Sequence, residues 1–517
     1  MKKMRTAIVL LGLSLPVMAQ AAEFQPIGAL GMGGAGVARN NGALTAYWNP
    51  AGGAFNETPF AMHVGVGIGA RGSDGLAENI DRLSDIDFDR VKNFDSTKAN
   101  SVGEMVKTIT ILDDIGKRNG NIALNGSVPI GFAIKHVSFG VFGNFEGYIL
   151  PKADIINILP ENAGTTTTTS IADLYNAVAG QPNNNSNQYF SSAQTTALAN
   201  SFFNASLSTA TPISLGNATE LANAIGNQLN GSGIPADSTY NSLTTNLIPS
   251  LATTGGTNTF NKNTTSAMTK ALMYYEVPLS YGHPFDFGSF GKLGLGATAK
   301  IISGTVYQNQ VLLVNRKNGE DISSKELAED ISKNSKSTVN FGIDLGALYK
   351  YDTWLSVGLV AKNLNSPKFK GPDYEVPEYD PITNTVISSP TKKPGEDVTL
   401  KPQVRLGVAV EPTNWLMLAS DLDLTENDTV APGSVVGSSV KSRNLGGGAE
   451  VHPYSWLRIR GGAYKNLAAS DVGLVLTAGF TVFLLDVDGA FTTDTFKIGG
   501  SKIPQEAKVQ VAMSFAF

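Results

Sequence analysis

A glycine-rich stretch near the N-terminus has the spacing of a nucleotide-binding loop. Gly31, Gly33 and Gly36 match the pattern GxGxxG. Such a loop binds a dinucleotide when a buried strand precedes it and a helix begins within it. Here a predicted signal-peptide cleavage site lies just upstream, and Asn49 and Pro50 interrupt any helix downstream. The spacing alone therefore predicts no cofactor, and the glycines need another explanation.

The other residue types that carry chemistry are absent or scattered. The chain has no cysteine, which excludes disulfides, thiolate metal sites and thiol redox chemistry. No histidine has metal-ligand spacing such as HExxH, and no GxSxG nucleophile motif occurs. The histidines are His63, His136, His283 and His452. The net charge is −5 without a basic patch, so nucleic acid is not an expected partner. We predict no catalytic residue, no metal site and no enzymatic activity.

Residues 1–21 have the parts of a secretory signal peptide. Basic residues precede the apolar run Thr6–Val17, and a small-x-small cleavage site ends at Ala21. The apolar run is too short to span a bilayer core of about 30 Å. No later segment has about 20 uninterrupted apolar residues, so we predict an exported chain without transmembrane helices.

The C-terminal segment Glu506–Phe517 alternates strictly between two faces. Val509 and Val511 share one face, whereas Lys508 and Gln510 share the other, as in a strand between lipid and a wet lumen. Comparable runs predict fourteen strands, at about residues 60–71, 121–135, 137–149, 269–283, 290–306, 336–350, 354–364, 398–411, 415–425, 441–452, 456–466, 471–482, 485–494 and 506–517. We therefore predict an all-β fold: a fourteen-stranded antiparallel transmembrane β-barrel over residues 59–517. The final Phe517 resembles the C-terminal signal that barrel-assembly machinery recognises.

The connections alternate between tight turns and long loops, which is how outer-membrane barrels are arranged. We place the long loops, above all residues 72–120 and 150–268, outside the cell and both termini on the periplasmic side. Helical spacing within the first of these loops predicts a helix around residues 102–112. Segment Ala153–Lys262 has no Lys or Arg between Lys152 and Lys262, and is rich in Thr, Asn and Ser. A short amphipathic helix fits Ala218–Leu229, but for the segment as a whole we favour a disordered surface loop over an ordered lid.

The glycine-rich stretch is then interpreted as a plug, residues 22–58, that threads the barrel. Its small residues suit a compact segment in a narrow lumen, and an aromatic group follows them to contact the wall. The residues to which we assign plugging and gating are Gly31, Gly33, Gly34, Gly36, Tyr47, Trp48, Asn49 and Pro50.

Alternation also predicts which charges face the lumen. They are Lys300, Asp344, Arg405, Asp421, Asp423, Glu450, Arg458, Arg460, Asp486 and Asp488, together with Lys508. Two interpretations are open. We favour the one in which positive and negative side chains pair across the lumen and hold barrel and plug together, rather than one in which they bind a specific ligand. Pro129 and Pro278 lie within predicted strands, where proline removes a ladder hydrogen bond. Each marks either a bulge or a lateral opening to the membrane.

Several segments resemble a known family. The pattern GMGGAGVA…ALTAYWNPAGG over Gly31–Gly53 resembles the plug of FadL-type long-chain fatty-acid transporters. Segments such as Leu359–Leu364, Trp415–Asp423 and Gly446–Arg460 resemble the TraF-like conjugal-transfer branch more closely. The resemblance implies a plugged fourteen-stranded barrel in the outer membrane of a Gram-negative bacterium.

This resemblance also implies a function. It suggests uptake of small hydrophobic or amphipathic compounds, which leave sideways into the outer-membrane lipid. The alternative is a structural component of the cell surface, linked to conjugation and without transport.

Overall fold

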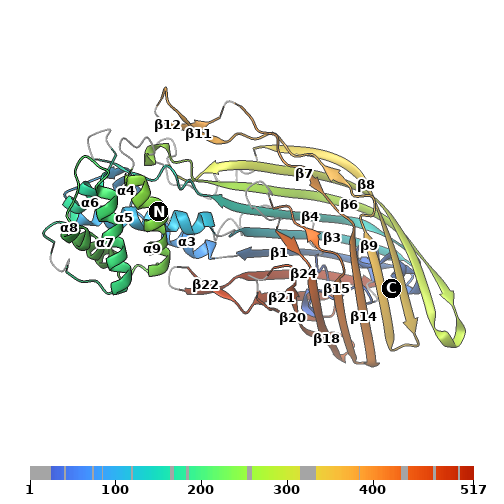
Figure 1. The fold of residues 1–517 in the computed structure, drawn as a ribbon. Helices are drawn as coiled ribbons and strands as arrows, with labels where there is room; N and C mark the ends of the chain where they lie inside the picture. Colours follow the sequence, from blue (N-terminus) through green and yellow to red (C-terminus); the bar gives the residue numbers. More distant parts are fainter. Residues whose placement is uncertain are drawn as a thin grey trace.

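The computed structural model describes residues 25–39, 42–72, 75–83, 85–117, 120–162, 168–181, 185–252, 259–314, 333–383, 385–389, 391–431, 440–469, 473–498 and 501–517. The predicted signal peptide lies outside these residues. Strands form a barrel at one end of the molecule and helices gather beyond it at the other (Figure 1).

The barrel is closed, antiparallel and fourteen-stranded, in the order β1-β24-β21-β20-β19-β18-β15-β14-β9-β8-β7-β6-β4-β3. Its strands are β1 Ala61–Gly72, β3 Ile122–Ile134, β4 Val137–Lys152, β6 Ser266–Asp286, β7 Lys292–Leu312, β8 Ser335–Tyr351, β9 Leu355–Lys362, β14 Gln403–Thr413, β15 Leu416–Asp423, β18 Asn444–Tyr454, β19 Leu457–Asn466, β20 Val475–Val482, β21 Leu485–Thr492 and β24 Glu506–Ala516. The predicted fold is confirmed.

The barrel has an apolar outer face and a polar inner one, as the alternation predicts. On β24, Val509 is 50% exposed, whereas Lys508 is buried. Trp354, Trp415 and Trp456 are exposed in the tight turns, each directly before the next strand or one residue before it. Tryptophan at the rim of an apolar band is typical of a membrane–water interface.

The connections between barrel strands contain short paired strands and 3-10 turns. The pairs are β2 Asn93–Phe94 with β5 Glu161–Asn162, β10 Lys368–Phe369 with β13 Val398–Thr399, β11 Pro377–Asp380 with β12 Thr385–Ser388, β16 Asn427–Asp428 with β17 Lys441–Ser442, and β22 Thr495–Ile498 with β23 Ser501–Pro504. Two short 3-10 helices, η5 Phe260–Lys262 and η6 Gly288–Phe290, precede β6 and β7.

The strand boundaries differ from the predicted ones by a few residues, and one predicted strand is divided. The run 398–411 is not a single strand, because Val398–Thr399 pairs with β10 and the barrel strand β14 begins only at Gln403. Alternation through this run predicts that Leu400 faces lipid together with Val404 and Leu406, but Leu400 is 1% exposed in a cluster inside the barrel. A period-2 pattern continued across a bend in the chain caused the error.

The two longest loops form one helical domain, so the predicted disordered loop is wrong within the described residues. Its helices are α3 Leu76–Leu83, α4 Phe88–Lys92, α5 Ala99–Lys117, α6 Ile171–Val178, α7 Ser192–Ser206, α8 Leu215–Leu229, α9 Ala236–Ser242, the π-helix η4 Leu243–Leu247 and α10 Ile248–Ala252. The helices predicted around residues 102–112 and 218–229 are present as α5 and α8.

Order in this domain comes from apolar burial and helix caps rather than from charge. Apolar residues of both loops share one hydrophobic core, which neither loop supplies alone. Ser170 and Ser191 each form a capping box, and Ser214 accepts the backbone N–H of Asn217. Low charge and a Thr- and Asn-rich composition resemble disorder, but the apolar spacing outweighs them. In the described part of the chain, no helix combines the length and apolar character needed to cross a membrane.

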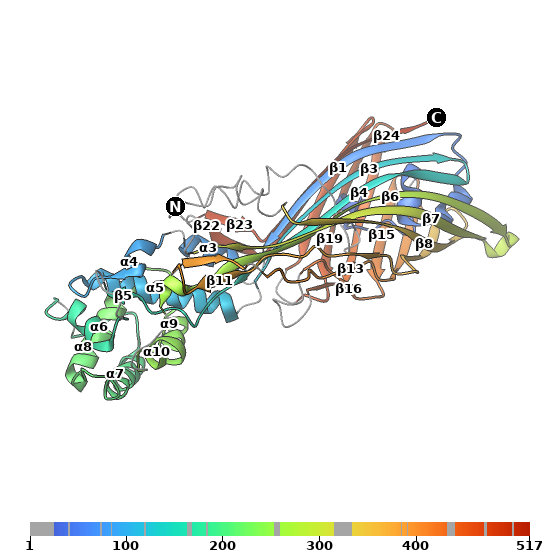
Figure 2. The same cartoon turned by 90° about the horizontal axis from the view of Figure 1, so that it is seen from above.

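The N-terminal segment lies inside the barrel, near the end with the tight turns (Figures 1 and 2). It contains η1 Leu30–Met32, η2 Gly42–Leu44, α2 Thr45–Trp48 and η3 Pro50–Phe55. We call its described residues, 25–39 and 42–58, the plug.

Candidate functional site: the plug and the charged wall around it

The plug is held together by its aromatic and amide side chains. Trp48 is 0% exposed, and its Nε1–H donates to the carbonyl of Ile27 over 2.8 Å. The Tyr47 hydroxyl donates to the carbonyl of Gln25 over 3.0 Å. Burial, and next the negative charge of Glu276, raises the pKa of Tyr47, so the phenol remains a donor. These bonds fold the start of the plug against its end.

Asn49 and Pro50 begin the last turn of the plug. The Asn49 side chain accepts the backbone N–H of Ala51 over 3.0 Å and caps η3, and Pro50 occupies the first helical position. The Asn49 amide also donates to the carbonyls of Val37 and of Ala347 on β8, each over 3.1 Å. One side chain therefore joins two parts of the plug and the wall.

Glycine is required where the plug meets its surroundings most closely. A Cβ on Gly36 would overlap the ring of Trp48. Gly33 has φ +64°, a left-handed conformation, and a Cβ there would overlap the carbonyl of Ala463 on β19. The glycines of the GxGxxG pattern thus permit close packing in the lumen, which explains them without a nucleotide.

Asp421 on β15 is the main acceptor for the plug backbone. It is 3% exposed, and its Oδ2 accepts the N–H of Gly36 over 2.8 Å and that of Val37 over 3.0 Å. Arg405 on the neighbouring β14 donates from Nε to Asp423 Oδ1 over 2.6 Å and from Nη1 to the Gly34 carbonyl over 3.4 Å. Asp421 thus accepts backbone N–H groups of the glycine-rich segment, and Arg405 on the adjacent strand donates to one of its carbonyls.

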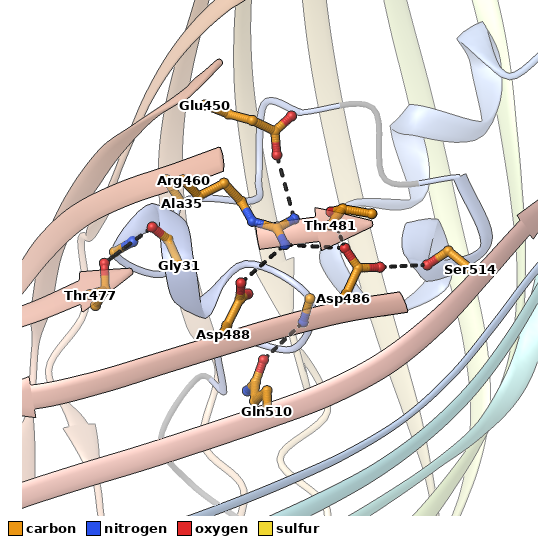
Figure 3. A network of polar contacts seen from close by, with 12 residues as sticks. Gly31, Ala35, Glu450, Arg460, Thr477, Thr481, Asp486, Asp488, Gln510 and Ser514 are labelled. Carbon is orange, nitrogen blue, oxygen red and sulfur yellow. Dashed lines mark hydrogen bonds and ion pairs between the residues drawn. The ribbon is translucent and has the colours of Figure 1, made fainter. Parts of the chain in front are cut away.

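A second group of charges surrounds Arg460 (Figure 3). Its guanidinium contacts Asp486 and Asp488 over 3.1 Å each, and Glu450 over 3.5 Å. Glu450 also pairs with Arg39 of the plug over 3.3 Å. Buried charges need such partners, because an unpaired ion in the lumen loses its hydration.

Hydrogen bonds from uncharged wall residues complete this side of the site. Thr477 Oγ1 accepts the N–H of Gly33 and donates to the carbonyl of Gly31, over 3.2 Å each (Figure 3). Gln510 Oε1 accepts the N–H of Gly28 over 3.2 Å.

On the opposite wall, Lys300 on β7 is almost fully buried between two acids. Its Nζ lies 2.9 Å from Glu276 Oε1 and 3.0 Å from Asp344 Oδ2. Lys362 on β9 places its ammonium 4.0 Å from the centroid of the Tyr47 ring, a cation–π contact with the plug.

The sequence-predicted charges lie mostly where alternation places them. Nine are buried inside the barrel: Lys300, Asp344, Arg405, Asp421, Asp423, Glu450, Arg460, Asp488 and Lys508. Asp486 is partly exposed, and Arg458 is exposed at the turn end of β19, where the wall no longer covers it. Sequence reasoning missed the wall residues Glu276 and Thr477, although Glu276 alternates inward within a predicted strand, and it placed Gln510 on the inner face without its contact to the plug. The partner of Glu276 is Lys300 on the adjacent strand β7, and the partners of Thr477 and Gln510 lie in the plug.

Proline interrupts the barrel on one side of the β3–β4 hairpin. Between β1 and β3 the register runs from Val64 opposite Ile130 to Gly67 opposite Ser127, so the ladder is broken at Pro129. The ladder between β3 and β4 continues through the same proline. The missing N–H therefore affects the β1 side alone.

The other side of this hairpin has a matching interruption. Between β4 and β6 the register passes from Phe139 opposite Leu279 to Phe142 opposite Glu276, so the ladder is broken at Pro278. The register is the same before and after each proline, whereas the register shifts of the pairs β14–β15 and β18–β19 lie at strand ends beside turns. The two interruptions thus lie on either side of the β3–β4 hairpin, away from the strand ends.

The histidines have structural partners. His63 Nδ1 lies 3.0 Å from Ser514 Oγ, and His452 Nε2 lies 2.7 Å from Glu450 Oε1. His136 contacts the carbonyl of Gly53 in the plug. Among the described residues, no group of three His, Cys, Asp or Glu is placed to hold a metal ion.

The family of the chain follows from comparison with known proteins. The model of the family described as "F plasmid transfer operon, TraF, protein" matches residues 46–423, which include part of the plug, the helical domain and β1 to β15. The chain belongs to this TraF family. The resemblance drawn from the sequence is confirmed. No curated protein matches it.

Solved barrels resemble the TraF-family chain over most of its length. The toluene transporter TbuX of Ralstonia pickettii covers 95% of this chain and 98% of its own, with 11% identity and a TM-score of 0.39. The toluene transporter TodX of Pseudomonas putida covers 97% and 99%, with 10% identity and a TM-score of 0.39. A FadL homologue of Pseudomonas aeruginosa covers 97% and 98%, with 10% identity and a TM-score of 0.34.

Proposed function

We propose that this protein is an outer-membrane barrel that takes up small hydrophobic or amphipathic compounds through its plugged lumen. The two interrupted ladders beside the β3–β4 hairpin carry the proposal. Strands of a closed barrel are hydrogen-bonded on both sides, so a passage from the lumen into lipid requires a break in a ladder. Pro129 and Pro278 each supply one.

The plug lies against the same hairpin. The Tyr47 ring packs on Phe142 with 5.4 Å between centroids, and the Ala43 carbonyl lies so close to Gly131 that a Cβ there would overlap it. These contacts are apolar or steric, whereas the earlier part of the plug is held by the hydrogen bonds of Asp421 and Thr477. In the proposed route, a ligand enters from the helical side, displaces residues 42–48 and leaves beside the hairpin.

Valine in place of Pro129 tests the proposal, since it returns a backbone N–H to the ladder with β1. Cells that lack the native protein would produce each variant, and uptake of a fatty acid, toluene and an alkyl detergent would be measured. We expect Pro129→Val or Pro278→Val to reduce uptake of the transported probe toward that of cells without the protein. Pro412→Val, at a turn, is the matched control. Unchanged uptake of all three probes on deletion of the gene would contradict the proposal.

Membership of the TraF family favours one other function, a surface component of conjugation without transport. The helical domain supports it, because a separately packed core outside the barrel is suited to contact with another cell. Removal of residues 153–262 is then expected to lower mating efficiency while uptake of every probe is unchanged. The reverse pattern would favour transport.

A further inference from the structure

Two loops on the helical side turn back into the barrel and form an apolar layer there. Phe369 is 0% exposed and Leu400 and Val430 are 1% exposed, although all three lie in connections between barrel strands. We call the cluster that they form with the wall the loop layer. Its buried members are Ala123, Tyr148, Leu150, Leu272, Tyr274, Ile302, Val306, Phe369, Val398, Leu400, Val430 and Ala431.

Polar contacts join both loops to neighbouring strands on one side of the wall. Glu396 Oε2 lies 2.9 Å from Lys270 Nζ on β6, and the Glu396 N–H donates to Gln308 Oε1 on β7 over 2.8 Å. The second loop reaches β4, where the Val430 N–H donates to Glu146 Oε1 over 3.3 Å. The second loop starts at the end of β15, which lies across the barrel from β4 in the strand order, so this loop crosses the lumen.

The register separates the loop layer from the plug along β7. A Cβ on Gly294 or Gly296 would contact plug residues 50–55, whereas a Cβ on Gly304 would overlap the Phe369 ring. Thr298 and Lys300 lie between these heights on the inner face, where Lys300 forms its buried ion pairs. We call the level of Thr298 and Lys300 the polar belt. Along the barrel axis, the loop layer, the polar belt and the plug therefore follow one another.

We propose that the loop layer is a second closure of the lumen, in series with the plug. Displacement of the plug alone then leaves the polar belt separated from the helical side. A ligand that arrives from that side has to move Phe369 and its neighbours before it reaches the plug. The inference rests on the proposed function only in treating the lumen as a passage. What it states physically is that the loop layer keeps solutes on the helical side from reaching the polar belt.

The absence of native cysteine allows access to be measured with a single reporter. Ser127 on β3 is buried between Ala123 of the loop layer and Gly131 of the plug contact, and Cys is nearly isosteric with Ser. Ser388, exposed on β12, is the reference. Each Cys variant of the full chain, in detergent, would react with a water-soluble maleimide. We expect Ser127→Cys to react about a hundredfold more slowly than Ser388→Cys, because reaction requires a local opening.

Opening the loop layer is then expected to expose the reporter. Phe369→Ala removes the central ring and should raise the Ser127→Cys rate by about tenfold or more, because a lost core ring shifts a closed state strongly toward open ones. Glu396→Gln removes the charge opposite Lys270 and should raise it by a smaller factor. The Ser388→Cys rate should stay constant in both backgrounds.

Three results would overturn the inference. They are equal rates for both reporters in the otherwise native chain, a slow Ser127→Cys rate that neither variant changes, and a rate that responds only to variants of the plug. Heat-modifiable gel mobility verifies that each barrel is folded. The assay uses no transported compound, so failure of every uptake probe would contradict the proposed function and leave this inference standing.

Discussion

Replacing Asp421 by alanine should release the plug from the wall. The change removes the acceptor for the N–H groups of Gly36 and Val37, which both remain buried. Each buried donor that loses its acceptor costs about 1–3 kcal/mol. Removal of a buried charge offsets part of this, so we expect a net loss of about 2–4 kcal/mol of plug docking. Asp421→Asn keeps an acceptor and should lose much less.

Trypsin reports the docking directly, because Arg39 is the only Lys or Arg between residues 25 and 70. Cleavage after Arg39 requires the plug to open, and its rate follows the open population when opening is fast. A loss of about 2–4 kcal/mol corresponds to a cleavage rate raised by roughly 30-fold to 1000-fold. Asp344→Ala is the matched control, because it removes a buried wall acid that pairs with Lys300 and accepts the N–H of Asn363, both outside the plug. Equal cleavage rates in Asp421→Ala and Asp344→Ala would refute the reasoning.

Other perturbations have equally specific outcomes. Trp48→Ala removes a fully buried ring and should cost about 3–5 kcal/mol of plug packing, which raises permeability to bulky antibiotics. Trp415, exposed at a turn, is the control, and Trp415→Ala should leave this permeability unchanged. Equal effects of the two variants would argue against the plug assignment. Burial opposes ionisation of Asp397, but hydrogen bonds from two lysine side chains and the Gly371 N–H prevail and lower its pKa to about 2. Because the unfolded value is about 3.9, this stabilisation is complete above about pH 4 and is lost as pH falls toward 2. The protection of the Gly371 N–H against hydrogen exchange, measured relative to its intrinsic rate at each pH, should fall over that range in the native chain and stay constant in Asp397→Asn.

The barrel was predictable because strand alternation is local. Every predicted strand is present, and most inward charges are buried, since a residue's face depends only on its position along one strand. The same logic fails where the chain bends, as at Leu400, and at a strand end, as at Arg458. The helical domain was misjudged because its core joins two loops, and neither loop alone reveals a partner for its apolar face.

The sequence by itself determined the strand number, the polarity of the two faces of the wall and the compact, glycine-rich character of the plug. Period-2 burial and glycine packing depend on neighbouring residues, so they can be read along the chain. Only the tertiary structure decided that Asp421 binds the plug backbone, that Glu450 joins Arg39 to Arg460, and that Phe369 lies above the plug. These contacts join residues far apart in the chain, and barrel closure and register, rather than local pattern, bring them together.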